Sequence, residues 1–221
     1  QLGRVLPILF NTDMVRAILD GRKTATRRAI KKYILDDAIF GYTAFTPKGY
    51  ISCRGTWEDG YGEKFFKLPC QKGDILYARE TFRPLSEHPA AGFDYAANWS
   101  SQYFKNSKDP NACNKGKWRP SIHMPKKAAR IWLKVTNVRV ERLQDITNEQ
   151  ILKEGISKET VDHYMAHFPE ATEEWIHAAH WLPFSDLWNS TVKKDFDLYS
   201  WDANPWVWVI EFERCEKPEE N

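Results

Sequence analysis

A cluster of basic and hydroxyl side chains near the start of the chain is the part of the sequence best suited to chemistry. Residues 21–28, Gly-Arg-Lys-Thr-Ala-Thr-Arg-Arg, hold four cations and two hydroxyl groups, and residues 21–32 hold six basic residues and no acidic one. Guanidinium and ammonium groups bind phosphate oxygens through charge-assisted hydrogen bonds. The stretch therefore predicts contacts from Arg22, Arg27 and Arg28 to nucleic-acid phosphates or another anion. Composition alone leaves a solvated basic turn open as the alternative.

A short helix is predicted immediately before this cluster, over residues 13–20. Asn11, Thr12 or Asp13 can cap its start, and Gly21 suits a left-handed conformation at its end. The cations are therefore expected at a defined place, on a chain that has just left a helix.

Strand patterns are spread over the rest of the chain, in residues 50–56, 75–79, 129–143 and 206–213. In the last stretch Trp206, Trp208, Ile210 and Phe212 are predicted to share one face. Short strands at both ends with few helices between them favour a small β-barrel, so the predicted fold class is α+β.

Helical patterns concentrate in an excursion at about residues 147–190. Thr147 and Gln150 form the sequence pattern of a capping box. Helices over 157–167, 173–180 and 184–188 are predicted to follow, the last two as separate short helices.

Composition bounds the class of protein. The chain has 221 residues, a net charge of +2 and 42% hydrophobic residues, which predicts one folded domain over residues 1–221. Residues 84–117, rich in Pro, Ala, Asn, Ser and Gly, predict an inserted loop. The six-residue apolar run Val5–Phe10 is too short for a signal peptide or a membrane span, so no membrane association is expected.

The cysteines and histidines predict neither a metal nor a cofactor. The four cysteines contain no C-x-x-C pair, which indicates reduced thiols and a cytoplasmic protein. His163 with His167, and His177 with His180, have spacings that metal ligands use, but neither pair lies in an H-E-x-x-H pattern. No Walker loop or G-x-G-x-x-G sequence is present.

Four stretches together resemble one family over nearly the whole chain. Gly21-Arg22-Lys23-Thr24-Ala25-Thr26-Arg27 is similar to the G-x-K-T-x-T-x-R signature of ASCH domains. The other stretches are Lys72–Leu76, Lys117–Pro125 and Ser200–Val209. The chain resembles the longer phage- and prophage-type members of that family. The resemblance implies a PUA-like β-barrel with flanking helices and an RNA or modified nucleoside as ligand.

The resemblance also implies three catalytic positions. Small bacterial ASCH members hydrolyse the amide of N4-acetylcytidine with a Thr, a Lys and a Glu, and other members have been assigned ribonuclease activity. The matching residues here are Lys23, Thr26 and Glu154. A lysine can activate a threonine hydroxyl only when its pKa is lowered, which nearby cations and burial favour. In the alternative, Lys23 binds phosphate, Thr26 bonds to the backbone and Glu154 pairs with a cation.

Further cations are candidates for nucleic-acid contacts. Lys117 and Arg119 lie in the third stretch of the resemblance, and Arg79 follows a predicted strand. Arg79-Glu80-Thr81 either lines the same pocket as Lys23 or contributes an ion pair that closes the barrel.

Three functions follow from these observations. Binding of RNA or a nucleoside in a basic cleft comes first, and hydrolysis of an N-acylated nucleoside, or ribonuclease activity, at the same site comes second. The third is a phage structural or assembly factor that binds a protein partner through a Trp-rich surface, since the chain has ten tryptophans. Aromatic rings beside the basic cluster would favour nucleic acid, and exposed rings away from it would favour a protein partner.

Overall fold

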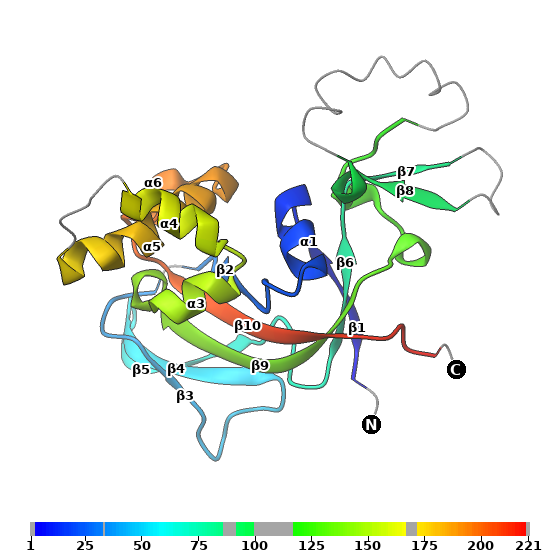
Figure 1. The fold of residues 1–221 in the computed structure, drawn as a ribbon. Coiled ribbons are helices and arrows are strands. Elements are labelled where there is room, and N and C mark those ends of the chain that lie inside the picture. Colours follow the sequence, from blue (N-terminus) through cyan, green and yellow to red (C-terminus); the bar gives the residue numbers. More distant parts are fainter. Residues whose placement is uncertain (1–2, 33, 86–91, 100–116, 167–171, 220–221) are drawn as a thin grey trace. The chain divides into compact units, whose positions relative to one another are not determined.

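The computed structural model describes residues 3–32, 34–85, 92–99, 117–166 and 172–219, with only the backbone of residues 173–177 (Figure 1). The chain divides into two compact units, which are described separately. Unit 1 comprises residues Gln1–Gly21, Asp74–Lys134 and Glu213–Asn221, and unit 2 comprises Arg22–Gly73 and Val135–Phe212. Most of the predicted insertion at 84–117 lies outside the described residues.

The described residues contain both strands and helices, so the predicted mixture of α and β structure is confirmed. The strands are β1 (Val5–Leu9), β2 (Ala25–Ala29), β3 (Ile39–Gly41), β4 (Tyr50–Trp57), β5 (Gly60–Lys67), β6 (Ile75–Arg79), β7 (Phe82–Pro84), β8 (Phe93–Tyr95), β9 (Trp132–Arg142) and β10 (Trp206–Cys215). The α-helices are α1 (Thr12–Leu19), α3 (Asn148–Lys153), α4 (Lys158–Ala166), α5 (Glu173–Thr191) and α6 (Phe196–Tyr199).

Unit 1 is built on β1, β6 and the first residues of β9. β1 pairs in parallel with β6, and β6 pairs antiparallel with β9, so that Leu76 lies opposite Leu133. The predicted helix is α1, and its cap is confirmed because Asn11 Oδ1 accepts a hydrogen bond from the Met14 N–H at 2.8 Å. Gly21 follows it with φ +76°, in the left-handed region that glycine adopts without strain.

A smaller cluster in unit 1 surrounds the β7–β8 pair. Phe82, Met124 and Ala128 form its apolar core. Arg83 makes a buried ion pair with Asp94, with Nη2 and Oδ2 2.9 Å apart, and its guanidinium lies 4.3 Å from the centre of the Trp118 ring. A buried charge is tolerated in this way because it is both paired and hydrogen-bonded.

Unit 2 holds β2 against β10 in an antiparallel pair, with Thr26 opposite Ile210. Both faces of β10 contain buried residues. Val207 and Val209 on one face and Trp208 and Ile210 on the other are all buried. The reason is tertiary, because the face that carries Val207 and Val209 belongs to the core beneath the helices.

The helices of unit 2 cover that core. Leu143, Ile151, Phe184, Trp188 and Trp201 are among its buried members. The capping box at the start of α3 is confirmed, with the Gln150 N–H donating to Thr147 Oγ1 and the Thr147 N–H donating to Gln150 Oε1.

The two short helices predicted over 173–180 and 184–188 are one continuous helix, α5. Pro183 lies inside it, although proline removes one helical hydrogen bond. Burial of Phe184 and Trp188 in the core keeps the helix continuous past the proline.

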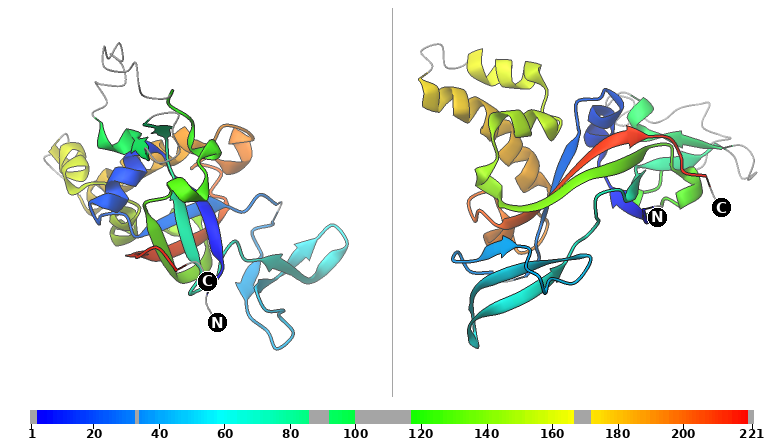
Figure 2. Two further views of the ribbon diagram at one scale, coloured as in Figure 1. Left: turned by 90° about the vertical axis from the view of Figure 1, so that its right-hand side faces the viewer. Right: turned by 90° about the horizontal axis from the view of Figure 1, so that it is seen from below.

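The remaining strands of unit 2 form a three-stranded antiparallel sheet in the order β3-β4-β5. β4 and β5 make a long hairpin with Trp57 opposite Gly60 at its turn, and Figure 2 shows this hairpin in cyan from two further directions. Neither β3 nor β5 is predicted from the sequence. β5 cannot be recognised from the sequence because most of its side chains are exposed, so its residues show little apolar alternation.

None of the helices in the described part of the chain has the length and apolar character needed to cross a membrane.

The core of unit 2 generates a stability prediction. Ile151 is fully buried, whereas its neighbour Leu152 is 36% exposed on the same helix. Replacing Ile151 by Ala leaves a cavity, so we expect the free energy of unfolding to fall by about 2–5 kcal/mol, measured by urea denaturation. Leu152→Ala is the matched control and should cost clearly less. Equal losses from the two variants would contradict the position of α3.

Candidate functional site

The basic signature, residues 21–28, forms hydrogen bonds with the C-terminal end of helix α3. The last carbonyls of a helix have no partner within it and attract cations. Here the carbonyls of residues 153–155 accept hydrogen bonds from Thr24 N at 2.9 Å, Lys23 Nζ at 2.7 Å and Arg22 Nη1 at 2.6 Å, respectively. Segments about 130 residues apart in sequence are thereby joined.

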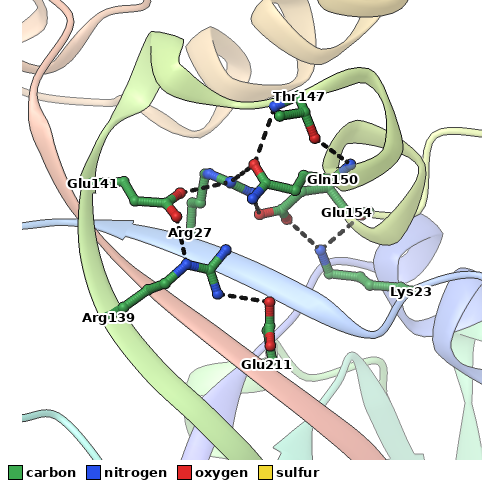
Figure 3. Close-up of polar contacts among 8 residues, drawn as sticks. All are labelled: Lys23, Arg27, Arg139, Glu141, Thr147, Gln150, Glu154 and Glu211. Carbon is green, nitrogen blue, oxygen red and sulfur yellow. Dashed lines mark hydrogen bonds and ion pairs between the residues drawn. The ribbon is translucent and has the colours of Figure 1, made fainter.

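Glu154 is the centre of this contact. It follows α3 directly, and its side chain is 4% exposed. Its Oε2 lies 2.7 Å from Lys23 Nζ, and its Oε1 lies 3.1 Å from Arg27 Nη1. Figure 3 shows both cations converging on this carboxylate. The structure therefore brings Lys23, Arg27 and Glu154 together.

The network extends beyond Glu154. Arg27 Nη2 also donates to Gln150 Oε1 at 2.8 Å and to Glu141 Oε2 at 3.1 Å. Arg139 joins Glu141 to Glu211, with Arg139 Nη1 2.6 Å from Glu211 Oε1 (Figure 3). Gln150 thus serves both the capping box and the ion network.

The ion pairs of this network join three cations, Lys23, Arg27 and Arg139, to three carboxylates. Arg28 is a fourth cation close enough to act on Glu154. Because the attraction of each buried cation is already used by a carboxylate, Lys23 and Arg27 support the site rather than offer net charge to a ligand.

Burial lowers the pKa of Lys23, because removing water penalises the ammonium form. Its contact with Glu154 opposes this shift, while the nearby Arg28 and Arg27 reinforce it. The direction agrees with what a general base requires.

Thr26 is buried within β2, one position before Arg27, and lies opposite Ile210 of β10. Arg27, the next residue, reaches Glu154. The structure therefore places Thr26 in the strand that adjoins the network.

A basic hollow of about 400 Å³ lies beside β2 in unit 2. It is lined by five cations, two aromatic rings and three further residues, and none of these described lining residues is acidic: Arg27, Arg28, Ala29, Lys31, Trp188, Thr191, Val192, Lys193, Lys194 and Tyr199. Lys31, Lys193 and Lys194 are exposed. The three exposed lysines give this hollow a positively charged lining, whereas Arg27 is paired with Glu154 and Glu141.

One atom of the Arg27 side chain has an unused hydrogen-bonding capacity. Arg27 Nε is buried and has no hydrogen-bond partner among the described residues, although buried donors are nearly always paired.

The rings in the hollow are held in place. Trp188 is 7% exposed, and its Nε1 donates to the Tyr199 carbonyl at 2.8 Å. Lys193 and Lys194 directly follow the C-terminal end of α5, where cations are favoured.

These residues of α5, α6 and the loop between them were missed from the sequence. The adjacent lysines after a helical pattern were the available signal. Their proximity to the signature arises only from the packing of α5.

Other predicted contacts belong to unit 1. Arg79 Nη2 donates to the Ile122 carbonyl, and Lys117 and Arg119 are exposed. Glu80 is 1% exposed and accepts two hydrogen bonds from Arg130, at 2.9 and 3.0 Å. The ion pair between Glu80 and Arg130 therefore supports the interpretation of Arg79-Glu80-Thr81 as part of a structural ion pair.

The histidine pairs add no metal site to the described residues, where no group of three or more metal-binding side chains occurs. His167 lies outside those residues, and so does the side chain of His177.

Comparisons of the chain with protein-family models, with curated proteins and with solved structures give no match. The function is therefore argued from the site itself.

The buried carboxylate generates the second prediction. Glu154→Gln leaves Lys23 and Arg27 facing a neutral amide, so we expect a loss of about 3–5 kcal/mol in the free energy of unfolding. Glu149→Gln is the matched control, since Glu149 pairs with Lys153 on the same helix but is exposed, and it should cause no measurable loss. Urea denaturation of both variants checks this. Full stability of Glu154→Gln would show that the network is not a structural requirement.

Proposed function

We propose that unit 2 binds RNA or a nucleoside derivative through the basic hollow beside β2. The observation that carries the proposal is the lining of the hollow, which combines five cations with Trp188 and Tyr199 and has no carboxylate among its described members. Phosphate groups need cations, and nucleobases need aromatic faces. A nucleotide presents both groups at once.

The buried network supports this proposal by separating two roles. Lys23 and Arg27 are neutralised by Glu154 and Glu141. Lys31, Lys193 and Lys194 are exposed and remain to attract phosphate. The signature thus positions β2, and the residues after it supply the positive surface.

The Tyr199 ring supports binding of a base rather than of phosphate alone, because it is only partly buried. Trp188 is buried in the core and holds Tyr199 in place, since its Nε1 donates to the Tyr199 carbonyl. Aromatic rings beside the cations are the arrangement that favours nucleic acid.

A PUA-like barrel of the ASCH type is the fold that this proposal includes. It is supported by the signature over Gly21–Arg27, by the antiparallel pairing of β2 with β10, and by helix α3 against β2. The contact between Lys23 and Glu154 joins the two parts of the chain that the family resemblance links.

A protein partner is favoured by a different observation in unit 2. Tyr42, Phe45 and Tyr61 are 65%, 84% and 72% exposed, and none of them lines the basic hollow. Exposed rings away from the cations are the arrangement that favours a protein partner, and Tyr42 lines a separate hollow of about 450 Å³.

The third prediction tests the basic hollow. Replacing Lys31, Lys193 and Lys194 together by Ala removes three exposed cations, so binding of a single-stranded RNA should weaken. The slope of log affinity against log salt should fall by about 2, at roughly 0.7 per cation. Fluorescence anisotropy at several salt concentrations measures both, and gel analysis of the RNA afterwards reports any ribonuclease activity.

A triple variant of Arg54, Lys67 and Lys158 to Ala is the control. These residues are equally charged and exposed in unit 2 but lie outside the basic hollow. If both triple variants lose RNA affinity to the same extent, binding depends only on the net charge of the protein, and the basic hollow is not a specific site.

Amide hydrolysis of an N-acylated nucleoside is a second candidate, favoured by one observation. Lys23 is buried against Glu154, and its burial lowers its pKa. A lysine of this kind can take the proton of the Thr26 hydroxyl as that oxygen attacks the amide carbonyl, and can return the proton to the leaving nitrogen, while the Glu154 carboxylate holds the lysine in place.

The fourth prediction addresses this candidate. Because the pKa of Lys23 is lowered, its neutral amine gains population as pH rises through that value, so hydrolysis of N4-acetylcytidine should increase with pH. Lys23→Met and Thr26→Val should lose turnover, whereas Lys153→Met, on the exposed side of α3, should keep it. Mass spectrometry of the nucleoside measures the product. Wild-type turnover by folded Lys23→Met, or no product from the wild type, would exclude the mechanism.

A further inference from the structure

A second hollow of unit 2 lies beside the β4–β5 hairpin and is not used by the proposed function. Its volume is about 510 Å³, and Lys32, Trp57, Glu58, Lys64, Phe65 and Phe66 are among its lining residues. Three of these six side chains are aromatic, and two are lysines. We refer to it as the aromatic hollow.

The rings and lysines of the aromatic hollow are organised. Trp57 and Phe66 are stacked, with ring centres 6.2 Å apart and planes 30° apart. Lys64 Nζ lies 4.3 Å from the centre of the Trp57 ring, and Lys32 Nζ lies 4.9 Å from that of Phe66. Each lysine thus lies over a ring. Lys64, whose side chain is 48% exposed, also pairs with Asp59, with Nζ and Oδ1 3.7 Å apart. A base that stacks on Trp57 would take the place of the Lys64 ammonium over that ring.

The position of Trp57 is fixed from the opposite strand. Its Nε1 donates to the Gly62 carbonyl at 3.1 Å. A ring held in this way can receive a flat partner without losing further rotational freedom.

The linings of the two hollows include consecutive residues. Lys31 lines the basic hollow, and Lys32 lines the aromatic one. Their backbone forms a tight turn in which the Lys32 N–H donates to the Ile30 carbonyl at 2.8 Å. Since consecutive Cα atoms are about 3.8 Å apart, one cation of each hollow lies at this turn.

We infer that the two hollows bind successive parts of one single-stranded RNA, with an unpaired base stacked on the ring wall of the aromatic hollow. This inference rests on the proposed function, and it specifies the ligand as an oligonucleotide rather than a lone nucleoside. A nucleoside fills one hollow only, whereas a strand can place phosphates along Lys31 and Lys32 and a base against Trp57. Glu58 offers an acceptor for a base amino group. The base must be unpaired, because the faces of paired bases are covered by stacking within a duplex.

The fifth prediction compares ligand lengths. Fluorescein-labelled RNAs of two and eight nucleotides are titrated against wild type, Trp57→Leu and the matched control Tyr61→Leu, whose ring is 72% exposed on the same hairpin. Trp57→Leu should weaken binding of the eight-nucleotide RNA by about 5- to 150-fold, the range that corresponds to one lost base–aromatic stack. Its binding of the dinucleotide should not change, and Tyr61→Leu should match wild type throughout.

A second variant keeps the test decisive if Trp57→Leu unfolds. Lys64→Gln retains the rings and removes one cation whose side chain is 48% exposed, so it should reduce the salt slope for the eight-nucleotide RNA only. An eight-nucleotide DNA and a duplex RNA, measured in parallel, test the sugar and the need for an unpaired base.

The outcomes separate this inference from the proposed function. Equal wild-type affinity for the two RNA lengths, or unchanged binding by folded Trp57→Leu and Lys64→Gln, overturns the role of the aromatic hollow and leaves the basic hollow standing. Duplex RNA binding as tightly as the single strand overturns the stacked base. No binding of either RNA by the wild type overturns the proposed function itself.

Discussion

The need to neutralise one buried carboxylate governs the arrangement of unit 2. Glu154 sits at the end of α3 with almost no contact with water, and an unpaired charge in that position would be too costly to bury. Lys23 and Arg27 pair with it, and Lys23 also satisfies its carbonyl. Helix α3 and strand β2 are therefore fastened together by charge as well as by apolar contact.

This constraint divides the basic signature into two functions. Inward-facing cations hold the fold, as Arg27 does by reaching Glu141, Gln150 and Glu154 at once. Cations that follow them, with Lys193 and Lys194 from another part of the chain, make the surface around the basic hollow. The six basic residues of the cluster consequently have two roles in the structure. Some hold strand β2 to helix α3, and others form part of the surface of the basic hollow.

The position of the basic hollow explains why rings and charges occur together there. The same α5 helix that buries Phe184 in the core presents Trp188 at the hollow and ends just before Lys193 and Lys194. Stability of the core and placement of the proposed binding surface thus depend on one helix. A change that loosens α5 is expected to disturb both, so binding measurements require a parallel measure of folding.

The sequence by itself determined the local features of this protein. The helix cap at Asn11, the capping box at Thr147 and the strand at 206–213 follow from side-chain chemistry and periodicity over a few residues. It also indicated Lys23 and Glu154 as partners, although only through family resemblance. Tertiary structure alone decided the rest. It made α5 continuous through Pro183, buried both faces of β10, and brought Lys193 and Lys194 to the hollow that Arg28 lines. These outcomes depend on contacts between distant segments, which no local pattern encodes.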